Sequence, residues 1–358
     1  MCGPQGRNHG VPRMTDDTPS LLLPAFVRRL SDPSIRTVLL CGCGGGFDFV
    51  HGLALYPELV RLGKAVVLGS YSFGNPGKIG GDAPVVFEEA GAVVKRVTAA
   101  SVPDPYYGPE VHACSFLDRR YPGASPHAAY AYYARAFTVP LLRRLYGQLV
   151  REHAVDAAVL VDGGSDSLMA GDEEGLGDPI EDAVSVAAVA SLGGLRLKVL
   201  ISVGLGADRY NQVSDAASLR AVAELTRAGG FLGALGLEPD GPALCFYRDC
   251  LTHVYERQGF RSVLAGSIVS AAEGWFGREE VPPLLRGRVR PGQAFLWPLM
   301  AMLWAFDVEA VARRSPTVGW IRDCRTVAGC YAALSAGRQA RGVRPVKNLP
   351  PHEEMRGG

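Results

Sequence analysis

The sequence has no uninterrupted apolar run of the roughly 18 residues that a membrane-spanning helix needs. Its first twenty residues include Gly, Pro, Asn, Asp and Arg, without the apolar core of a secretory signal peptide. No stripe of Lys and Arg alternates with aromatic residues, and 37 basic residues almost balance 36 acidic ones. This pattern disfavours a nucleic-acid-binding surface. We therefore expect a cytoplasmic protein that has neither a membrane nor a nucleic acid as its partner.

Cysteine motifs for metal binding are absent as well. The eight cysteines form no Cys-x-x-Cys pair and have no matching His spacing for a zinc site. Cys41 and Cys43 are separated only by Gly42. We expect the cysteines to be reduced and mostly buried as apolar side chains, as is usual in a cytoplasmic protein.

Strand-like and helix-like patterns alternate along most of the 358 residues, of which 47% are hydrophobic. Apolar runs of strand length predict buried strands at 36–41, 65–70, 92–97, 157–161 and 197–203. Strand, helix, strand in this order requires crossover connections. The order therefore predicts an α/β fold, with a mainly parallel, Rossmann-like sheet and helices on both faces.

Two further parts of the chain have their own composition. The Pro- and Tyr-rich segment 101–126 is expected to be a long insertion, followed by a helix over 127–153. Helical patterns dominate the last third of the chain, at 244–258, 262–274 and 297–314. These helices are expected to cover the sheet or to form a small cap.

The expected organisation is a single α/β domain over 20–337, with a helical C-terminal region from about residue 242. Residues 1–19 are polar and rich in Pro and Gly, which predicts a disordered leader. Residues 338–358 contain Arg, Pro and Gly and are expected to form a flexible tail.

An acidic loop after the predicted strand at 157–161 is the most informative stretch of the sequence. Its acidic residues, with those that follow it, are Asp162, Asp166, Asp172, Glu173, Glu174, Asp178, Glu181 and Asp182. So many carboxylates at the end of a buried strand repel one another, and a metal ion or a cationic substrate would relieve that repulsion. A structural interpretation stays open, in which residues 172–174 are solvated and Asp178 caps the next helix.

A glycine-rich loop after the first predicted strand is the second candidate. Its glycines would let backbone amides approach an anion at a helix N-terminus, and they are Gly42, Gly44, Gly45 and Gly46. The loop resembles the first motif of S-adenosylmethionine-dependent methyltransferases and, more loosely, a dinucleotide fingerprint. The second strand, however, lacks the carboxylate that both families place on the ribose. Asp48 and His51 follow three residues apart and can share a helix face, although a core or capping role is the alternative for His51.

Parallel sheets bind ligands at the carboxyl ends of their strands. The loops expected to meet there are 42–48, 70–81, 162–174 and 204–211. The polar side chains that these loops would bring together are Asp48, Asn75, Asp162, Asp166, Asp208 and Arg209. This convergence is the main argument for a site.

Three motifs in combination resemble the uncharacterised bacterial and archaeal family called "domain of unknown function 1152". They are Cys41-Gly42-Cys43-Gly44-Gly45-Gly46-Phe47-Asp48, the stretch from Asp162 to Glu173, and Gly274-Trp275-Phe276-Gly277. The resemblance covers about residues 30–315 and implies a family but no activity.

Two local similarities concern the acidic loop alone. Residues 162–171 are similar to the Asp-Gly-Gly-Asn-Glu-x-Gly-Met-Gly motif of D-glutamate cyclases, with Ser165 in place of Asn and one glycine fewer. They are also similar to the Ser-Gly-Gly-x-Asp-Ser loop of ATP pyrophosphatases. There Asp162 replaces the leading Ser and puts a negative charge where a pyrophosphate must approach.

These patterns favour an enzyme that acts on a small, polar, amino-acid-like metabolite by acyl or amide chemistry: cyclisation, lactam opening or hydrolysis. Asp162 and Asp166 would hold a divalent ion, Mg²⁺ or Mn²⁺, or the ammonium group of the substrate. Asp48 or Asp208 would be the general base, and the metal would polarise the carbonyl. The amides of Gly42–Gly46 would bind the substrate carboxylate or an oxyanion. The remaining predicted substrate-binding residues are His51, Asn75, Ser165, Ser167 and Arg209.

Two other functions stay open from the sequence. One is a nucleotide- or S-adenosylmethionine-dependent transferase, with an adenosyl or phosphate group on the Gly42–Gly46 loop. The other is a non-catalytic small-molecule-binding or assembly protein, which would have a plain surface instead of an acid-lined pocket. The oligomeric state is open too, a homo-oligomer included.

Overall fold

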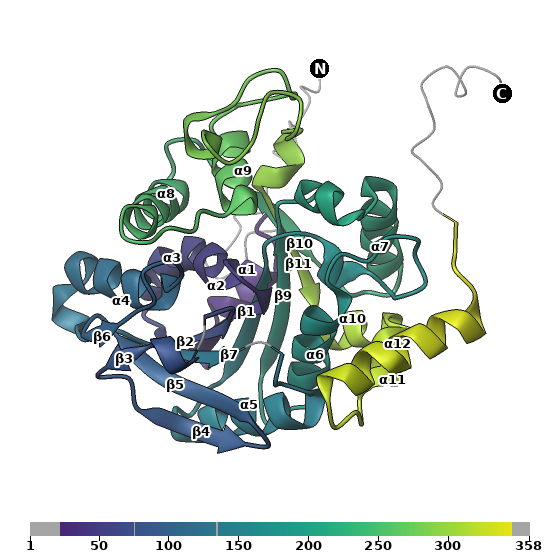
Figure 1. The fold of residues 1–358 in the computed structure, drawn as a ribbon, viewed down its shortest axis with the longest axis horizontal. Helices are drawn as coiled ribbons and strands as arrows, with labels where there is room; N and C mark the ends of the chain where they lie inside the picture. Colours follow the sequence, from purple (N-terminus) through teal and green to yellow (C-terminus); the bar gives the residue numbers. More distant parts are fainter. Residues whose placement is uncertain (1–21, 75, 134, 346–358) are drawn as a thin grey trace, which may run out of the picture.

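The computed structural model describes residues 22–74, 76–133 and 135–345. A sheet of nine strands forms its centre (Figure 1). From one edge to the other the strands are β10 (Phe231–Gly236), β11 (Met302–Asp307), β9 (Leu197–Val203), β8 (Ala157–Asp162), β1 (Thr37–Gly45), β2 (Ala65–Ser72), β7 (Ala128–Tyr133), β5 (Ala92–Thr98) and β4 (Val85–Glu89). The strands from β9 to β7 are parallel, and those at both edges are antiparallel. This confirms the predicted α/β fold with a mainly parallel sheet.

The chain builds this sheet outward from β1 in two directions. It first adds β2 and β7 on one side of β1, and later adds β8 and β9 on the other side. The connections therefore diverge at the carboxyl ends of β1 and β8. In open α/β sheets this switch point leaves a crevice in which ligands bind.

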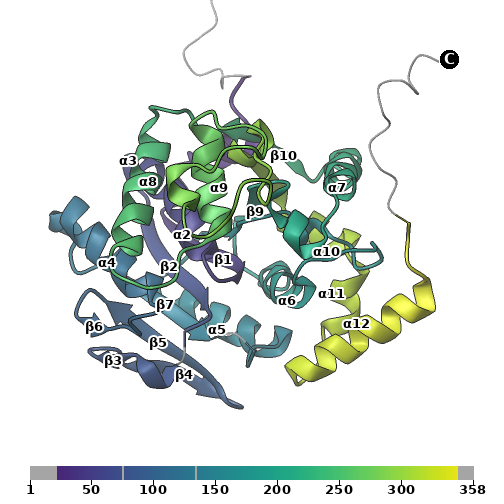
Figure 2. The ribbon, with the colours of Figure 1, turned by 45° about the horizontal axis from the view of Figure 1, so that its top comes forward.

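Helices cover both faces of the sheet (Figures 1 and 2). Alternate residues of β1 point to opposite faces, so Leu40 belongs to one core cluster and Leu39 to the other. The helices of the first cluster are α1 (Ala25–Leu30), α2 (Asp48–Gly52), α3 (Tyr56–Arg61), α4 (Pro109–Arg120), α8 (Pro242–Tyr255) and α9 (Val263–Ala272). Those of the second are α5 (Val139–Glu152), α6 (Pro179–Ala190), α7 (Asp215–Arg227), α10 (Val308–Arg314), α11 (Pro316–Ile321) and α12 (Val327–Arg341). The C-terminal helices are thus divided between the two faces.

Short elements complete the described residues. The strands β3 (Gly80–Gly81) and β6 (Ser101–Val102) pair in a separate ribbon. The 3₁₀ helices are η1 (Leu53–Leu55), η2 (Pro76–Lys78), η3 (Pro122–Ala124), η4 (Asp166–Leu168), η5 (Ala207–Asn211), η6 (Pro283–Leu285) and η7 (Pro298–Ala301). Within the described residues, no helix is both long enough and apolar enough to cross a membrane.

Three sequence-based assignments are wrong. Pro109–Arg120 is helix α4 instead of part of an insertion, and Ala128–Tyr133 is the parallel strand β7 instead of the start of a helix. Met302–Asp307 is strand β11, which precedes α10 in a segment predicted to be all helix. An apolar run carries no periodicity that separates a buried strand from a buried helix, so only the partner strands decide.

The predicted leader, 1–19, lies outside the described residues. At the other end, α12 continues to Arg341, and Arg344 forms ion pairs with Asp172 and Glu173. Ordered contacts thus extend several residues past 338, where the sequence predicts the start of a flexible tail.

Candidate functional site

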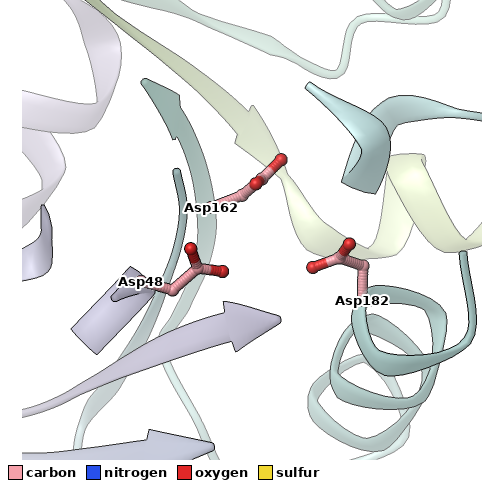
Figure 3. A group of neighbouring side chains, drawn as sticks. All are labelled: Asp48, Asp162 and Asp182. Atoms are coloured by element: carbon pink, nitrogen blue, oxygen red, sulfur yellow. The ribbon is translucent and has the colours of Figure 1, made fainter. Parts of the chain in front are cut away.

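The candidate site lies at the switch point of the sheet, where β1 and β8 end side by side. Asp162 is the last residue of β8, and Asp48 is the first residue of α2, which follows β1 closely. Asp182 comes from the first turns of α6. Figure 3 shows the three carboxylates pointing toward a common space. Each offers an oxygen, and these oxygens lie within 4.8 Å of one another.

A cavity of about 400 Å³ contains these three side chains and further acidic groups. Its apolar lining includes Phe47, Phe73 and Phe260. Among the residues that the structure describes, no Lys or Arg lines it. Its seven acidic lining residues are Asp48, Asp162, Asp166, Asp178, Glu181, Asp182 and Asp208.

Most of these carboxylates are removed from water. Asp48, Asp162 and Asp182 are 8%, 2% and 4% exposed, and Glu181 and Asp208 are also buried. Charges in such a place repel one another strongly, because little solvent screens them. The acidic side chains are therefore gathered where their ionised forms are least stable.

The pKa values of these groups are raised by burial and by the repulsion between them. Burial, with nearby carboxylates, raises the pKa of Asp48 to about 7 and that of Glu181 to about 8. Burial also raises the pKa of Asp166 to about 6. The same causes raise the pKa values of the others well above their usual range, and these are Asp162, Asp182 and Asp208. Without a cation, several of these groups hold protons near neutral pH.

His51 lines the same cavity but cannot supply a compensating charge. Burial lowers its pKa to about 3, so the imidazole is neutral at physiological pH. Its Nδ1 lies 2.6 Å from the hydroxyl of Tyr247, which orients the ring. Among the described residues, the carboxylates thus have no cationic partner inside the cavity.

Hydrogen bonds hold most of these carboxylates in place, but one carboxylate oxygen accepts no hydrogen bond from the described residues. Asp48 accepts hydrogen bonds from the amides of Gly44 and Gly163, at 2.8 and 3.0 Å. Ser167 donates its hydroxyl to Asp162. In contrast, Oδ1 of Asp182 is buried and has no hydrogen-bond partner among the described residues. A buried acceptor without a donor is costly, so this oxygen points to a ligand that the cavity receives.

The glycines of both predicted loops make room for these carboxylates. A Cβ at Gly44 would lie 2.6 Å from Oδ1 of Asp182, and one at Gly164 would lie 2.1 Å from Oδ2 of Asp208. The amides of Gly44 and Gly45 donate to the carboxylates of Asp48 and Glu181. They are therefore engaged by the protein's own anions, whereas the sequence predicts that they bind a substrate anion.

The structure brings the four predicted catalytic residues Asp48, Asp162, Asp166 and Asp208 to this cavity, together with His51. Several predicted substrate-binding residues lie elsewhere. The Ser165 hydroxyl lies 2.9 Å from that of Ser218, and Arg209 forms an ion pair of 2.7 Å with Asp215. The Arg209 guanidinium also lies 4.6 Å from each of the rings of Phe295 and Trp297, and it lines a different cavity together with Phe295. Asn75 is outside the described residues.

Three further lining residues, Asp178, Glu181 and Asp182, are not among the site residues predicted from the sequence. Asp178 is the N-cap residue of α6, although its side chain makes no capping hydrogen bond. Glu181 and Asp182 lie in the first turns of that helix. Their position could have indicated a role in the site, because a helix N-terminus favours acidic side chains and this helix follows the acidic loop.

The second half of the acidic loop has a different role. Asp172 and Glu173 are buried, and Arg344 pairs with them at 2.7 and 2.9 Å. Arg341 also pairs with Asp172, at 3.0 Å. Although burial opposes it, these arginines lower the pKa of Asp172. Carboxylates that serve the fold are thus neutralised by arginines, whereas those of the cavity are not.

We expect Arg344→Ala to destabilise the protein by about 2 kcal/mol, because it leaves two buried carboxylates with fewer partners. Urea unfolding of the variant measures this change. The matched control is Arg325→Ala, at an exposed arginine that forms no ion pair with the described residues. Equal free energies of unfolding for the two variants would show that the contacts of Arg344 do not stabilise the fold.

Comparison with known proteins gives one match. A family model described as "Protein of unknown function (DUF1152)" matches residues 138–338, more than half of the chain. No curated protein and no solved structure matches the chain, so the similarity to D-glutamate cyclases is not shown. The matched range includes Asp162, Asp182 and Asp208, but it begins after Asp48 and ends later than the sequence motifs suggest. The chain belongs to the DUF1152 family of proteins of unknown function.

Proposed function

We propose that the acidic cavity binds a divalent metal ion, Mg²⁺ or Mn²⁺, and that the protein is an enzyme for a small polar metabolite. The observation that carries this proposal is a cavity lined by seven acidic residues and, among the described residues, by no Lys or Arg. Carboxylate oxygens are the ligands that such hard cations prefer. The unpartnered oxygen of Asp182 is where a cation would be stabilised most.

The proposed metal ligands are Asp48, Asp162 and Asp182, because their oxygens lie within 4.8 Å of one another. Asp48 keeps its orientation through two backbone amides, and Asp162 does so through Ser167. Such outer contacts hold metal ligands ready before the ion binds. Metal binding would displace the protons that these carboxylates hold near neutral pH.

Carbonyl chemistry suits this cavity better than phosphoryl chemistry. A phosphate group would bring further negative charge to a wall of carboxylates, without the arginines or lysines that usually stabilise it. The amides of the Gly42–Gly46 loop that would hold a nucleotide include two already engaged by Asp48 and Glu181. We therefore favour acyl or amide chemistry, in ring closure, ring opening or hydrolysis, over nucleotide-dependent transfer.

In this proposal the ion would polarise the carbonyl group of the substrate. Asp208 would move the proton, as the general base. Burial raises its pKa well above the usual range, and the bound cation would favour the ionised form that a general base needs. The Ser165 amide donates to Asp208 at 2.6 Å and fixes its direction.

Calorimetric titration of the metal-stripped protein with Mg²⁺ and Mn²⁺ tests the proposal. We expect saturable binding to the unmodified protein, and a loss of at least about a hundredfold in affinity for Asp162→Asn, because one ligand charge disappears in a buried site. The control is Glu174→Gln, an exposed acid of the same loop. Absence of binding to the unmodified protein, or unchanged binding to Asp162→Asn, would refute the metal site.

A further inference from the structure

We infer that the substrate of this site is an organic amine that also carries the carbonyl of the proposed reaction, whose ammonium group lies beside Glu181 and Phe73 and whose apolar part lies against an aromatic wall. This inference rests on the proposed function and names the substrate class of the same cavity. It departs from the amino-acid-like substrate that the sequence suggests, because no Lys or Arg among the described residues lines the cavity to hold a free carboxylate.

The charge of the cavity favours a cation as the second ligand. One divalent ion offsets two charges, whereas seven acidic residues line the cavity. The ion would be held by Asp48, Asp162 and Asp182, so four acidic residues of the lining are left to balance a second cation. His51 is neutral and adds no positive charge. An ammonium group is stabilised in such a field, and a carboxylate or a phosphate is repelled.

Glu181 and Phe73 are adjacent at the cavity wall. A Cβ placed on Gly45 would lie 2.1 Å from the Phe73 ring and 2.5 Å from Oε2 of Glu181. Only a glycine lets the ring and the carboxylate approach each other here. A carboxylate beside an aromatic ring combines an ion pair with a cation–π contact, and this pair of contacts is typical of ammonium recognition.

Glu181 is oriented by a hydrogen bond and is not paired with a cation among the described residues. Its Oε2 accepts a hydrogen bond of 3.1 Å from the amide of Gly45, and the side chain forms no ion pair within 4.0 Å with the described residues. Arg135 is exposed and does not line the cavity. An ammonium group would supply the missing charge.

The aromatic wall consists of Phe47, Phe73 and Phe260, which line the cavity. The ring centroids of Phe47 and Phe260 lie 5.7 Å apart, and the buried Tyr107, which is not part of the lining, lies 5.6 Å from Phe260 and 6.5 Å from Phe73. Phe73 is 52% exposed, which is unusual for a phenylalanine. A substrate with an apolar body would cover this ring. The volume of about 400 Å³ is near the lower end for small-molecule sites and suits a small monoamine better than a peptide or nucleotide.

Calorimetry on the Mg²⁺-saturated protein tests this inference with three probes. 2-Phenylethylamine has both an ammonium group and an aromatic body, ethanolamine lacks the aromatic body, and 3-phenylpropionate replaces the ammonium group by a carboxylate. We expect saturable binding of 2-phenylethylamine, about tenfold weaker binding of ethanolamine and no binding of 3-phenylpropionate. Tighter binding of 3-phenylpropionate than of 2-phenylethylamine would overturn the inference, and so would absence of amine binding.

Two variants locate the ammonium group. Glu181→Gln should weaken 2-phenylethylamine by about tenfold while leaving Mg²⁺ affinity within about threefold, since Glu181 is outside the proposed ligand trio. Phe73→Leu should weaken the aromatic amine through loss of the cation–π contact. Unchanged amine affinity in Glu181→Gln would contradict the inference alone. If the unmodified protein does not bind Mg²⁺, the proposed function is contradicted instead, whether or not amines bind.

Discussion

Asp182→Asn is expected to stabilise the metal-free protein and, at the same time, to remove its binding of divalent ions. The carboxylate is 4% exposed, its Oδ1 has no hydrogen-bond partner among the described residues, and three other aspartates act on it. Asparagine has the same shape without the charge, so folding no longer requires a buried carboxyl group either to ionise or to keep its proton. We expect a gain of about 3 kcal/mol in the free energy of unfolding at pH 8.

Asp172→Asn is the matched control for this experiment. The chemical change is identical, and the residue is also buried, but Asp172 pairs with Arg341 and Arg344. Its substitution should destabilise the protein by about 1–3 kcal/mol and leave Mg²⁺ binding unchanged. Urea unfolding with and without Mg²⁺ measures both variants. The hypothesis is wrong if Asp182→Asn lowers the stability of the metal-free protein or still binds Mg²⁺ normally.

The second large effect expected is a loss of stability of the metal-free protein as the pH rises from about 4 to about 8, between the unfolded and folded pKa values of the buried carboxyls. In the folded protein, Asp48 and Glu181 have pKa values of about 7 and about 8, whereas carboxyls of an unfolded chain titrate near pH 4. The folded state therefore holds protons that the unfolded state has already released. Because it binds more protons in this window, the free energy of unfolding falls with rising pH.

The slope should be about 1.4 kcal/mol per pH unit for each carboxyl group that is still protonated. Asp162 and Asp208 extend the decline, since their pKa values are raised well above the usual range. Below about pH 6.5 His51 acts in the opposite direction, because its lowered pKa keeps it neutral in the folded state while the unfolded chain binds a proton. His51 therefore cancels the slope of one carboxyl group below about pH 6.5, so the decline is steeper above that pH.

Urea unfolding of the metal-stripped protein at pH 6.5, 7.5 and 9 measures this effect. Saturating Mg²⁺ should offset the decline, because metal-bound carboxylates are ionised and bind the ion more tightly as protons become scarce. Asp182→Asn should have a shallower decline, since one of the coupled carboxyls is gone. A stability that is constant or rises between pH 6.5 and pH 9 would show that the cavity carboxylates are not protonated in the folded state.

The location of the site could be predicted from the sequence to a useful degree. Carboxylates that follow buried parallel strands must meet at one edge of the sheet, whatever the details of the helices. Asp48, Asp162 and Asp208 were selected on that basis, and the structure places them in one cavity. The same argument could not place Asp182, because a residue on a crossover helix has no fixed relation to the sheet edge until the helix packs.

The different roles of the acidic residues could not be predicted from the sequence either. Asp166 and Asp172 are six positions apart in one loop, yet one lines the cavity and the other is neutralised by Arg341 and Arg344. These arginines come from a helix and a segment far along the chain. Local charge density therefore cannot tell a ligand site from an ion-pair network.

The sequence by itself determined the α/β class, the alternation of strands and helices, and the supply of carboxylates at strand ends, because these follow from local hydrophobic patterns and short loops. Only the tertiary structure decided that Ala128–Tyr133 joins the parallel strands, that Asp182 completes the group with Asp48 and Asp162, and that the amides of Gly44 and Gly45 face carboxylates. Strand pairing, burial and charge compensation depend on contacts between distant segments. The unbalanced charge of the cavity, which carries the functional proposal, arises from such contacts.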